Sequence, residues 1–166
     1  MNTSSLCKIV FFSGLMLASS ASFAAVASTT FAVNATVASQ CSISATPLNF
    51  GTYDPLATLD NTASSTVTVT CSNLQSVTVN LDKGTTAGST EGARLMALAN
   101  KPPMSYGLYS DGAHAMNWGT GTAGVITIGA GLNSPVLLTV HGIIPKGQYS
   151  VGVGGYSDLI TATVTY

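Results

Sequence analysis

The sequence predicts an all-β domain that folds as an antiparallel β-sandwich. Polar and apolar side chains alternate along most of the chain, and Gly, Pro, Asn and Asp residues separate the alternating segments. No segment shows a convincing helical period. Many short strands with regular turn signals are typical of a sandwich that is immunoglobulin-like in outline, although no tryptophan lies between Cys41 and Cys71.

Residues 1–24 have the features of a secretory signal peptide. A single basic residue, Lys8, precedes the apolar run that starts at Ile9, and Ser22 and Ala24 occupy the small-residue positions before the cleavage point. A transmembrane helix is the alternative, but the apolar run is shorter than the roughly 20 residues that span a bilayer. Cleavage leaves about 140 residues, which suffice for one domain.

The segment T-T-F-A-V-N-A-T-V-A, residues 29–38, alternates like a half-buried strand. It stands ahead of Cys41, and no hairpin partner precedes it in the mature chain. The alternation alone leaves open whether this segment is the first strand of a self-sufficient sandwich or pairs elsewhere.

The later strands also show a period of two. Residues 64–72 place Val67, Val69 and Cys71 on one face, and residues 75–82 do the same with three further apolar side chains, Val77, Val79 and Leu81. We expect further strands at 104–111, 125–128, 134–144 and 159–166, and a helical turn at 92–99.

The cysteine count favours one disulfide. Cys7 leaves with the signal peptide, and in an oxidising compartment the remaining pair, Cys41 and Cys71, usually forms a bond, here closing a loop of about 30 residues. This bond would attach the first strand to the core and leave residues 25–36 upstream of it. A metal site is the competing interpretation, but only His114 and His141 could join the cysteines and no C-x-x-C spacing is present.

The last residues form an apolar edge. In residues 159–166 the side chains of Ile160, Ala162, Val164 and Tyr166 fall on one face, with no further strand to cover them. An exposed apolar edge invites pairing with another chain. The alternative is that Tyr166 is the last core residue of a complete fold.

The low content of charged residues favours a protein that packs into an assembly. Charged residues make up only 7% of the chain, and no basic patch is available for nucleic acid. A surface rich in Thr, Ser, Gly, Ala and Val is typical of a protein that packs against others, with an ordinary small secreted β-domain as the alternative.

Catalytic and cofactor motifs are not expected. The stretch G-T-G-T-A-G at 119–124 matches G-x-G-x-x-G, but a strand-like segment follows where the dinucleotide fingerprint requires a helix, so we expect a flexible loop. His114 lies in an expected turn and His141 in an expected strand, each as a solvated or packed side chain. The sequence therefore predicts no enzyme, no cofactor, no metal and no small-molecule substrate.

Several motifs occur together in one order. These are T-F-A-V-N-A-T-V, L-N-F-G-T-Y-D-P-L, T-V-T-V-T-C, M-S-Y-G-L-Y-S-D with N-W-G-T-G-T, V-H-G-I-I-P-K-G-Q-Y and G-G-Y-S-D-L-I-T-A-T-V-T-Y. In this order they resemble the spore coat protein U domain family, which includes the pilin subunits of archaic, Csu-type chaperone-usher pili. The resemblance covers essentially all of the mature chain, and none of its motifs is a catalytic signature.

The resemblance implies an incomplete immunoglobulin-like sandwich that lacks its last strand. Residues 38–166 would form the domain, and residues 25–37 would be an extension donated to the next subunit. Its inserted face would carry Phe31, Val33, Ala35 and Val37. The C-terminal strand, with Ile160, Ala162, Val164 and Tyr166, would contact first a chaperone and then the donated segment.

The implied partners are neighbouring copies or related pilins, a periplasmic chaperone and an outer-membrane usher. The implied role is that of a pilus subunit, exported through the periplasm to the cell surface, for adhesion and biofilm formation. A spore or cell-surface coat protein of the same domain family is the alternative. A small secreted binding domain or enzyme that acts as a monomer is the third hypothesis.

Overall fold

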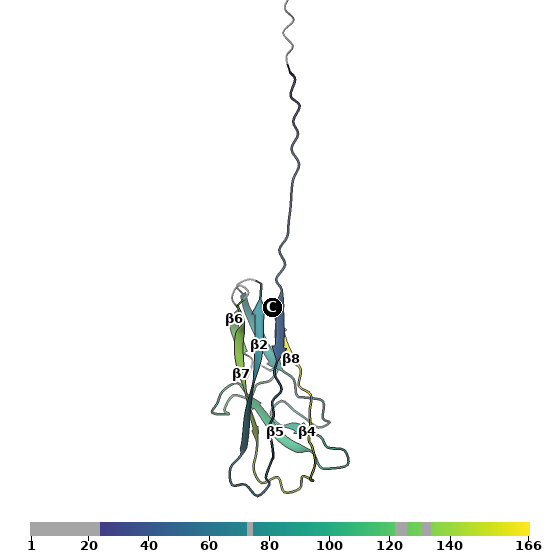
Figure 1. The fold of residues 1–166 in the computed structure, drawn as a ribbon, viewed down its shortest axis with the longest axis vertical. Helices are drawn as coiled ribbons and strands as arrows, with labels where there is room; N and C mark the ends of the chain where they lie inside the picture. The colour runs from purple at the N-terminus through teal and green to yellow at the C-terminus, as the bar shows by residue number, and fades with distance from the viewer. Residues whose placement is uncertain (1–23, 73–74, 122–125, 131–133) are drawn as a thin grey trace, which may run out of the picture. The chain divides into compact units, whose positions relative to one another are not determined.

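The computed structural model of the chain describes residues 24–72, 75–121, 126–130 and 134–166. The chain divides into two parts, Met1–Thr36 and Val37–Tyr166. In the first part, residues 24–36 carry no helix or strand, and the expected signal peptide at 1–24 lies, except for Ala24, outside the described residues. The second part contains all the described strands (Figure 1).

The second part is an antiparallel sandwich of two sheets, as the sequence predicts. The larger sheet has the order β1-β2-β7-β5-β4 and the smaller one the order β6-β3-β8, and every described ladder within the two sheets is antiparallel. No helix occurs in the described ranges. The strands are β1 (Cys41–Ala45), β2 (Asn61–Cys71), β3 (Gln75–Leu81), β4 (Arg94–Met96), β5 (Met104–Tyr109), β6 (Ile126–Ala130), β7 (Val136–Ile144) and β8 (Ala162–Thr165).

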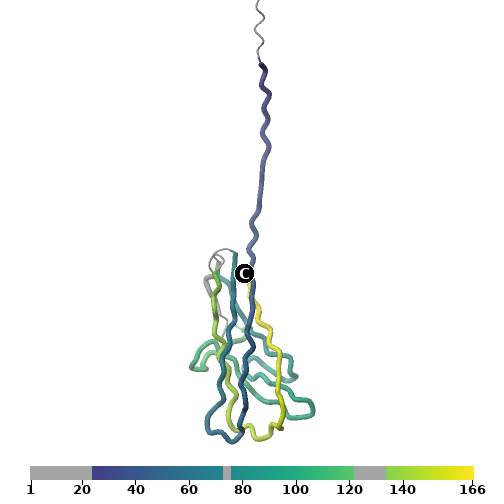
Figure 2. The backbone as a smooth tube through the Cα atoms, viewed as in Figure 1, coloured from purple at the N-terminus to yellow at the C-terminus, as the bar shows by residue number. Residues whose placement is uncertain are grey.

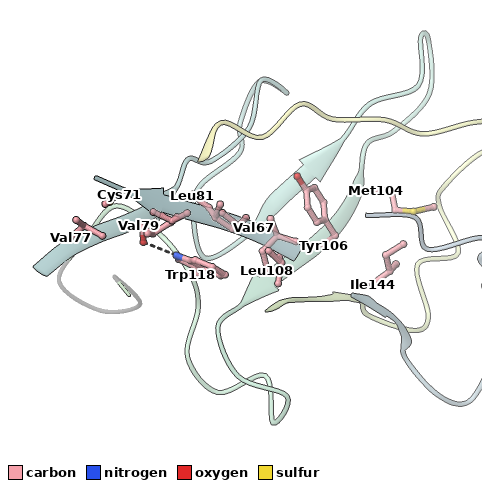
Figure 3. Packing of buried hydrophobic residues seen from close by; sticks show 12 residues of the cluster. Val67, Cys71, Val77, Val79, Leu81, Met104, Tyr106, Leu108, Trp118 and Ile144 are labelled. Atoms are coloured by element: carbon pink, nitrogen blue, oxygen red, sulfur yellow. Dashed lines mark hydrogen bonds between the residues drawn. The ribbon is translucent and has the colours of Figure 1, made fainter. Parts of the chain in front are cut away.

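Alternation in the sequence becomes alternation between core and surface. Strands β2, β3, β5 and β7 each turn every second side chain into one shared core, because successive side chains of a strand point to opposite faces. Figure 3 shows most of this cluster. Its buried apolar members are Val67, Val69, Cys71, Val77, Val79, Leu81, Met104, Tyr106, Leu108, Trp118, Val140 and Ile144.

Trp118 links the two sheets. Its ring is 0% exposed, and its Nε1–H donates to the carbonyl of Val79 in β3 at 2.9 Å (Figure 3). Its backbone N–H donates to the carbonyl of Leu108 in β5 at 2.9 Å. A large apolar ring with its polar group satisfied is thereby fixed between the layers.

The predicted disulfide between Cys41 and Cys71 is present. The two residues lie directly opposite each other on β1 and β2, so the bond joins neighbouring strands of one sheet. It differs in this from the bond between the two sheets of antibody domains.

The helical turn predicted for residues 92–99 is wrong. Arg94–Met96 forms strand β4, which pairs with β5 at the edge of the larger sheet. The Arg94 side chain is 0% exposed because all its N–H groups find acceptors inside the domain. These acceptors are the carbonyls of Leu81, Asp82, Glu91 and Trp118 and Oδ1 of Asn117.

The strand predictions at 64–72, 75–82, 104–111, 125–128, 134–144 and 159–166 are confirmed, with bounds shifted by up to three residues. In the G-T-G-T-A-G stretch, residues 119–121 form bends and residues 122–124 lie outside the described ranges. Strand β6 follows where a dinucleotide site would need a helix.

Candidate functional site

Strand β1 is the end strand of the larger sheet. The N–H of Thr46, just after β1, donates to the carbonyl of Thr66 in β2 at 2.9 Å. Because hydrogen-bonding direction alternates along an antiparallel ladder, the main-chain groups of Ile43 and Ala45 point away from β2.

Strand β8 ends the smaller sheet in the same way. The N–H of Asp82 donates to the carbonyl of Thr161 at 3.0 Å, and β8 continues this pairing with β3. The main-chain groups of Ala162 and Val164 therefore point away from β3. In Figure 2 the dark blue segment of β1 and the yellow C-terminal segment run side by side, yet none of the described ladders joins β1 to β8.

An open groove continues this seam beyond the two strands. It has a volume of about 520 Å³ and lies between residues 45–50 on one side and 156–162 on the other. A second hollow of about 560 Å³ shares several of its lining residues and extends it toward residues 51–55 and 151–155. The apolar residues that line the first groove are Ala45, Pro47, Leu48, Phe50, Val67, Leu81, Met96, Leu108, Val140, Leu159, Ile160 and Ala162.

The first wall, residues 45–50, and the residues that follow it up to 53 form no regular strand after Ala45, and a side chain of β2 holds them in place. Asn61 donates from Nδ2 to the carbonyls of Phe50 and Thr52, at 3.1 and 3.2 Å. Leu48 and Phe50 pack against the core over Gly142, where a Cβ atom would lie 2.8 Å from Phe50 Cζ and 2.9 Å from Leu48 Cδ1. A side chain at position 142 would push this wall outward.

The second wall is tied to both sheets. Ala97 and Ser157 exchange backbone hydrogen bonds of 2.9 and 3.1 Å, which attach the wall beyond β4. Asp158 then binds two further elements. Its Oδ2 accepts from the hydroxyl of Tyr106 at 2.7 Å, and its Oδ1 accepts from the backbone N–H groups of Thr85 and Thr86 at 2.9 and 3.3 Å and from their hydroxyls at 3.0 and 3.3 Å.

The electrostatics of this contact follow from its hydrogen bonds. Burial alone would raise the pKa of Asp158, but hydrogen bonds from Tyr106 and Thr85 outweigh it and hold that pKa below its usual value. Burial has the largest effect on the pKa of Tyr106 and raises it, and the hydrogen bond to Asp158 raises it further. Asp158 is therefore an anionic acceptor and Tyr106 a neutral donor at neutral pH.

The predicted C-terminal residues lie partly along the groove. Ile160 and Ala162 line it, and Val164 is half-buried in β8 against the core. Tyr166, after β8, is 53% exposed and does not line the groove.

The predicted N-terminal residues are exposed. Phe31, Val33 and Val37 are 84%, 83% and 89% exposed, and Ala35 is exposed as well. Residues 24–40 have no assigned strand, so the structure gives the alternating segment no ladder partner within the described part of its own chain.

Sequence reasoning missed the first wall and the role of Asp158. Leu48 and Phe50 carry a weak signal, since they are apolar at alternate positions after β1. Asp158 carries none, because its partners at 85, 86 and 106 are far away in sequence. The described residues contain no cluster of three or more potential metal ligands. Among the same residues, no helix has the length and apolar character that a membrane crossing needs.

Comparison with known proteins agrees with this architecture. Protein U of Myxococcus xanthus is 34% identical over 166 aligned positions, which cover 91% of each chain. A solved structure with the same fold is the CsuC–CsuE chaperone–tip adhesion subunit pre-assembly complex from archaic chaperone-usher Csu pili of Acinetobacter baumannii. It matches at a TM-score of 0.58 with 20% identity, over 79% of this chain and 41% of that chain. The sequence profile of the Spore Coat Protein U domain matches residues 27–163, and the chain thus belongs to the Spore Coat Protein U domain family.

Proposed function

We propose that this protein is a structural subunit of a surface pilus that polymerises by strand donation. Residues 25–37 of one copy lie as an added strand in the groove of the next copy, which continues the seam of β1 and β8. The observation that carries this proposal is an apolar groove that continues the seam of two end strands, whose outer main-chain groups point away from their own sheets.

The dimensions of donor and groove agree. At about 3.3 Å per residue, the segment from Phe31 to Val37 spans roughly 20 Å, and the wall segments 45–50 and 156–162, if extended, span roughly 16 and 20 Å. A slip by one residue would present Ala32, Asn34 and Thr36 instead. The apolar lining therefore favours the register that inserts Phe31, Val33, Ala35 and Val37.

Insertion gains free energy from burial and hydrogen bonds and loses free energy by ordering the donor. Burial of the three large donor side chains contributes about 5 to 8 kcal/mol, and each new ladder hydrogen bond adds about 1 kcal/mol. Ordering the donor opposes this by roughly 1 to 2 kcal/mol per residue. Covering the apolar walls of the acceptor supplies the remainder.

Export and assembly factors form part of the proposal. Residues 1–24 direct the chain to the periplasm, where a chaperone occupies the groove before an outer-membrane usher exchanges it for the donor of another copy. The likeness in fold to a chaperone-bound Csu subunit supports this sequence of events. The fibre then serves in adhesion and biofilm formation.

A charge placed on each face of the donor tests the proposal. Val33→Asp puts a carboxylate into the apolar groove, whereas Asn34→Asp adds the same charge at the neighbouring position on the opposite face. We expect Val33→Asp to abolish fibres seen by negative-stain microscopy and Asn34→Asp to leave them intact, with chaperone binding unchanged in both. Equal fibre yield for the two variants would contradict the proposed insertion.

A coat protein built from the same domain is the second candidate. The family description and the 34% identity to Protein U of Myxococcus xanthus favour it. Neighbouring genes for a periplasmic chaperone and an usher would support the pilus, and their absence from a sporulating source would support the coat.

A further inference from the structure

The fold brings the only two histidines of the chain together. His141 lies in β7 and His114 in the turn after β5, and their ring centroids are 6.3 Å apart with an interplanar angle of 84°. Both side chains are half-buried. Since Val140, Gly142 and Ile144 of β7 face the core, His141 lies on the outer face of the larger sheet.

The surrounding residues fix this pair. Tyr109 lies opposite His141 in the β5–β7 ladder, and its ring contacts the His114 ring edge-on with centroids 5.3 Å apart. The Tyr109 ring covers Gly107, where a Cβ atom would lie 2.6 Å from Tyr109 Cε2. Gly112 approaches the other imidazole, with its Cβ position 3.5 Å from His141 Cε1.

The turn that carries His114 has a defined conformation. Asp111 accepts hydrogen bonds from the N–H groups of Ala115 and Met116 at 3.2 and 2.7 Å. His114 itself has a φ of 54°, a left-handed conformation that non-glycine residues seldom adopt. Such backbone conformations persist where the surrounding contacts enforce them.

We propose that His114 and His141 bind one late first-row divalent metal ion: Cu²⁺, Ni²⁺ or Zn²⁺. Imidazole nitrogen suits these ions, which bind it at about 2.0 to 2.1 Å. A ring centroid lies about 1.2 Å behind its nitrogen, so two rings on one ion have centroids up to about 6.4 Å apart. The observed 6.3 Å is within this limit. At this distance the two rings lie on nearly opposite sides of the ion, an arrangement that square-planar Cu²⁺ and Ni²⁺ accept.

The charge nearby favours a cation. The Asp111 carboxylate, which accepts from the Met116 N–H at 2.7 Å, lies in the same turn as His114. No third side chain completes a cluster within the described ranges, and water fills the remaining coordination positions. This site is independent of the groove, so it stands whether or not the chain forms pili.

Calorimetric titration of the exported protein with CuSO₄, NiCl₂ and ZnCl₂ tests the site. We expect one ion per chain, with Cu²⁺ bound more tightly than Ni²⁺ or Zn²⁺ and no binding of MgCl₂. His114→Asn and His141→Gln should each lower the affinity by about 100-fold, because each turns a chelate into a single imidazole. Asn tolerates the left-handed backbone at position 114, and thermal melts would verify that both variants fold.

A matched control and a spectroscopic readout complete the test. Tyr109→Phe keeps the ring contact and should retain the affinity. The electron paramagnetic resonance spectrum of the Cu²⁺ form should show coupling to two imidazole nitrogens. Wild-type protein that binds these ions no better than the His114→Asn/His141→Gln double variant, or a spectrum with one imidazole only, would overturn the proposal.

Discussion

Asp158→Ala is the substitution that most directly weakens the second wall of the groove. The carboxylate accepts from the Tyr106 hydroxyl and from the backbone N–H and hydroxyl groups of Thr85 and Thr86. Alanine removes every one of these acceptor contacts. The segment 156–161 then keeps its hydrogen bonds to residues 82, 97 and 152 and its apolar contacts with the core.

The cost follows from the burial of each donor. Tyr106 is 5% exposed and its hydroxyl loses a charged acceptor, at a cost of about 1 to 3 kcal/mol. Thr85 is exposed and Thr86 is half-buried, so water replaces most of the hydrogen bonds that they lose. The loss of these bonds costs about 1 kcal/mol for the two residues together. We expect the free energy of unfolding to fall by about 2 to 4 kcal/mol.

Urea denaturation of wild-type and variant protein in the same assembly state measures this loss. Asp54→Ala is the matched control, since the Asp54 carboxylate in an exposed loop accepts from the Leu56 N–H at 2.8 Å, and its loss should cost less than about 1 kcal/mol. A double-mutant cycle with Tyr106→Phe should give a coupling of at least about 1 kcal/mol. Additive single effects would refute the assignment of the cost to the Tyr106 contact.

The same contact sets a pH dependence. Because the pKa of Asp158 is lower in the folded state than in the unfolded state, its contribution is present above the unfolded pKa of about 3.9 and is lost as pH falls through the folded value. The stability difference between wild type and Asp158→Ala should therefore be constant near neutrality and shrink below about pH 4. A difference that grows toward acid pH would contradict this sign.

Two further perturbations test the domain core. Reduction of the Cys41–Cys71 bond, which closes a 30-residue separation, should lower the free energy of unfolding by about 3.6 kcal/mol in the chain-entropy account, and an unchanged melting temperature on reduction would contradict the bond. Arg94→Lys should cost about 3 to 5 kcal/mol in urea denaturation, because an ammonium group has three donors where the buried guanidinium uses five. Lys101→Arg, at an exposed position, is the control. An equal loss in the free energy of unfolding for the two exchanges would refute the role of the buried Arg94 guanidinium.

The sequence predicted the strands well because nearly all of them are half-buried. Val67, Val69, Val77 and Val79 are buried at alternate positions, and this alternation is visible without any knowledge of strand partners. The expected disulfide followed from the count of cysteines in the mature chain. Strand β4 was missed because Arg94 interrupts the apolar pattern, and its burial depends on carbonyls from distant segments.

The candidate groove could not be predicted from the sequence for a related reason. Its two walls, residues 45–50 and 156–162, are mostly irregular, so they show no periodic pattern of apolar residues. Asp158 contacts Tyr106 only once the chain has folded, because the two residues are far apart in sequence. Ile160 and Ala162, which the sequence predicts at an apolar edge, line this groove. The proximity of His114 and His141 depends on the β5–β7 register, which the sequence does not specify.

Hydrogen exchange tests the central claim of strand donation most directly. In the assembled wild type, the amides of Ala45 and Ala162, which line the groove, should be protected by the donor of a neighbouring copy, and deletion of residues 25–36 should expose them. The Thr46 amide, which is bonded to the Thr66 carbonyl, should stay protected in both proteins. Equal protection of the Ala45 and Ala162 amides in the assembled wild type and in the protein without residues 25–36 would contradict the account.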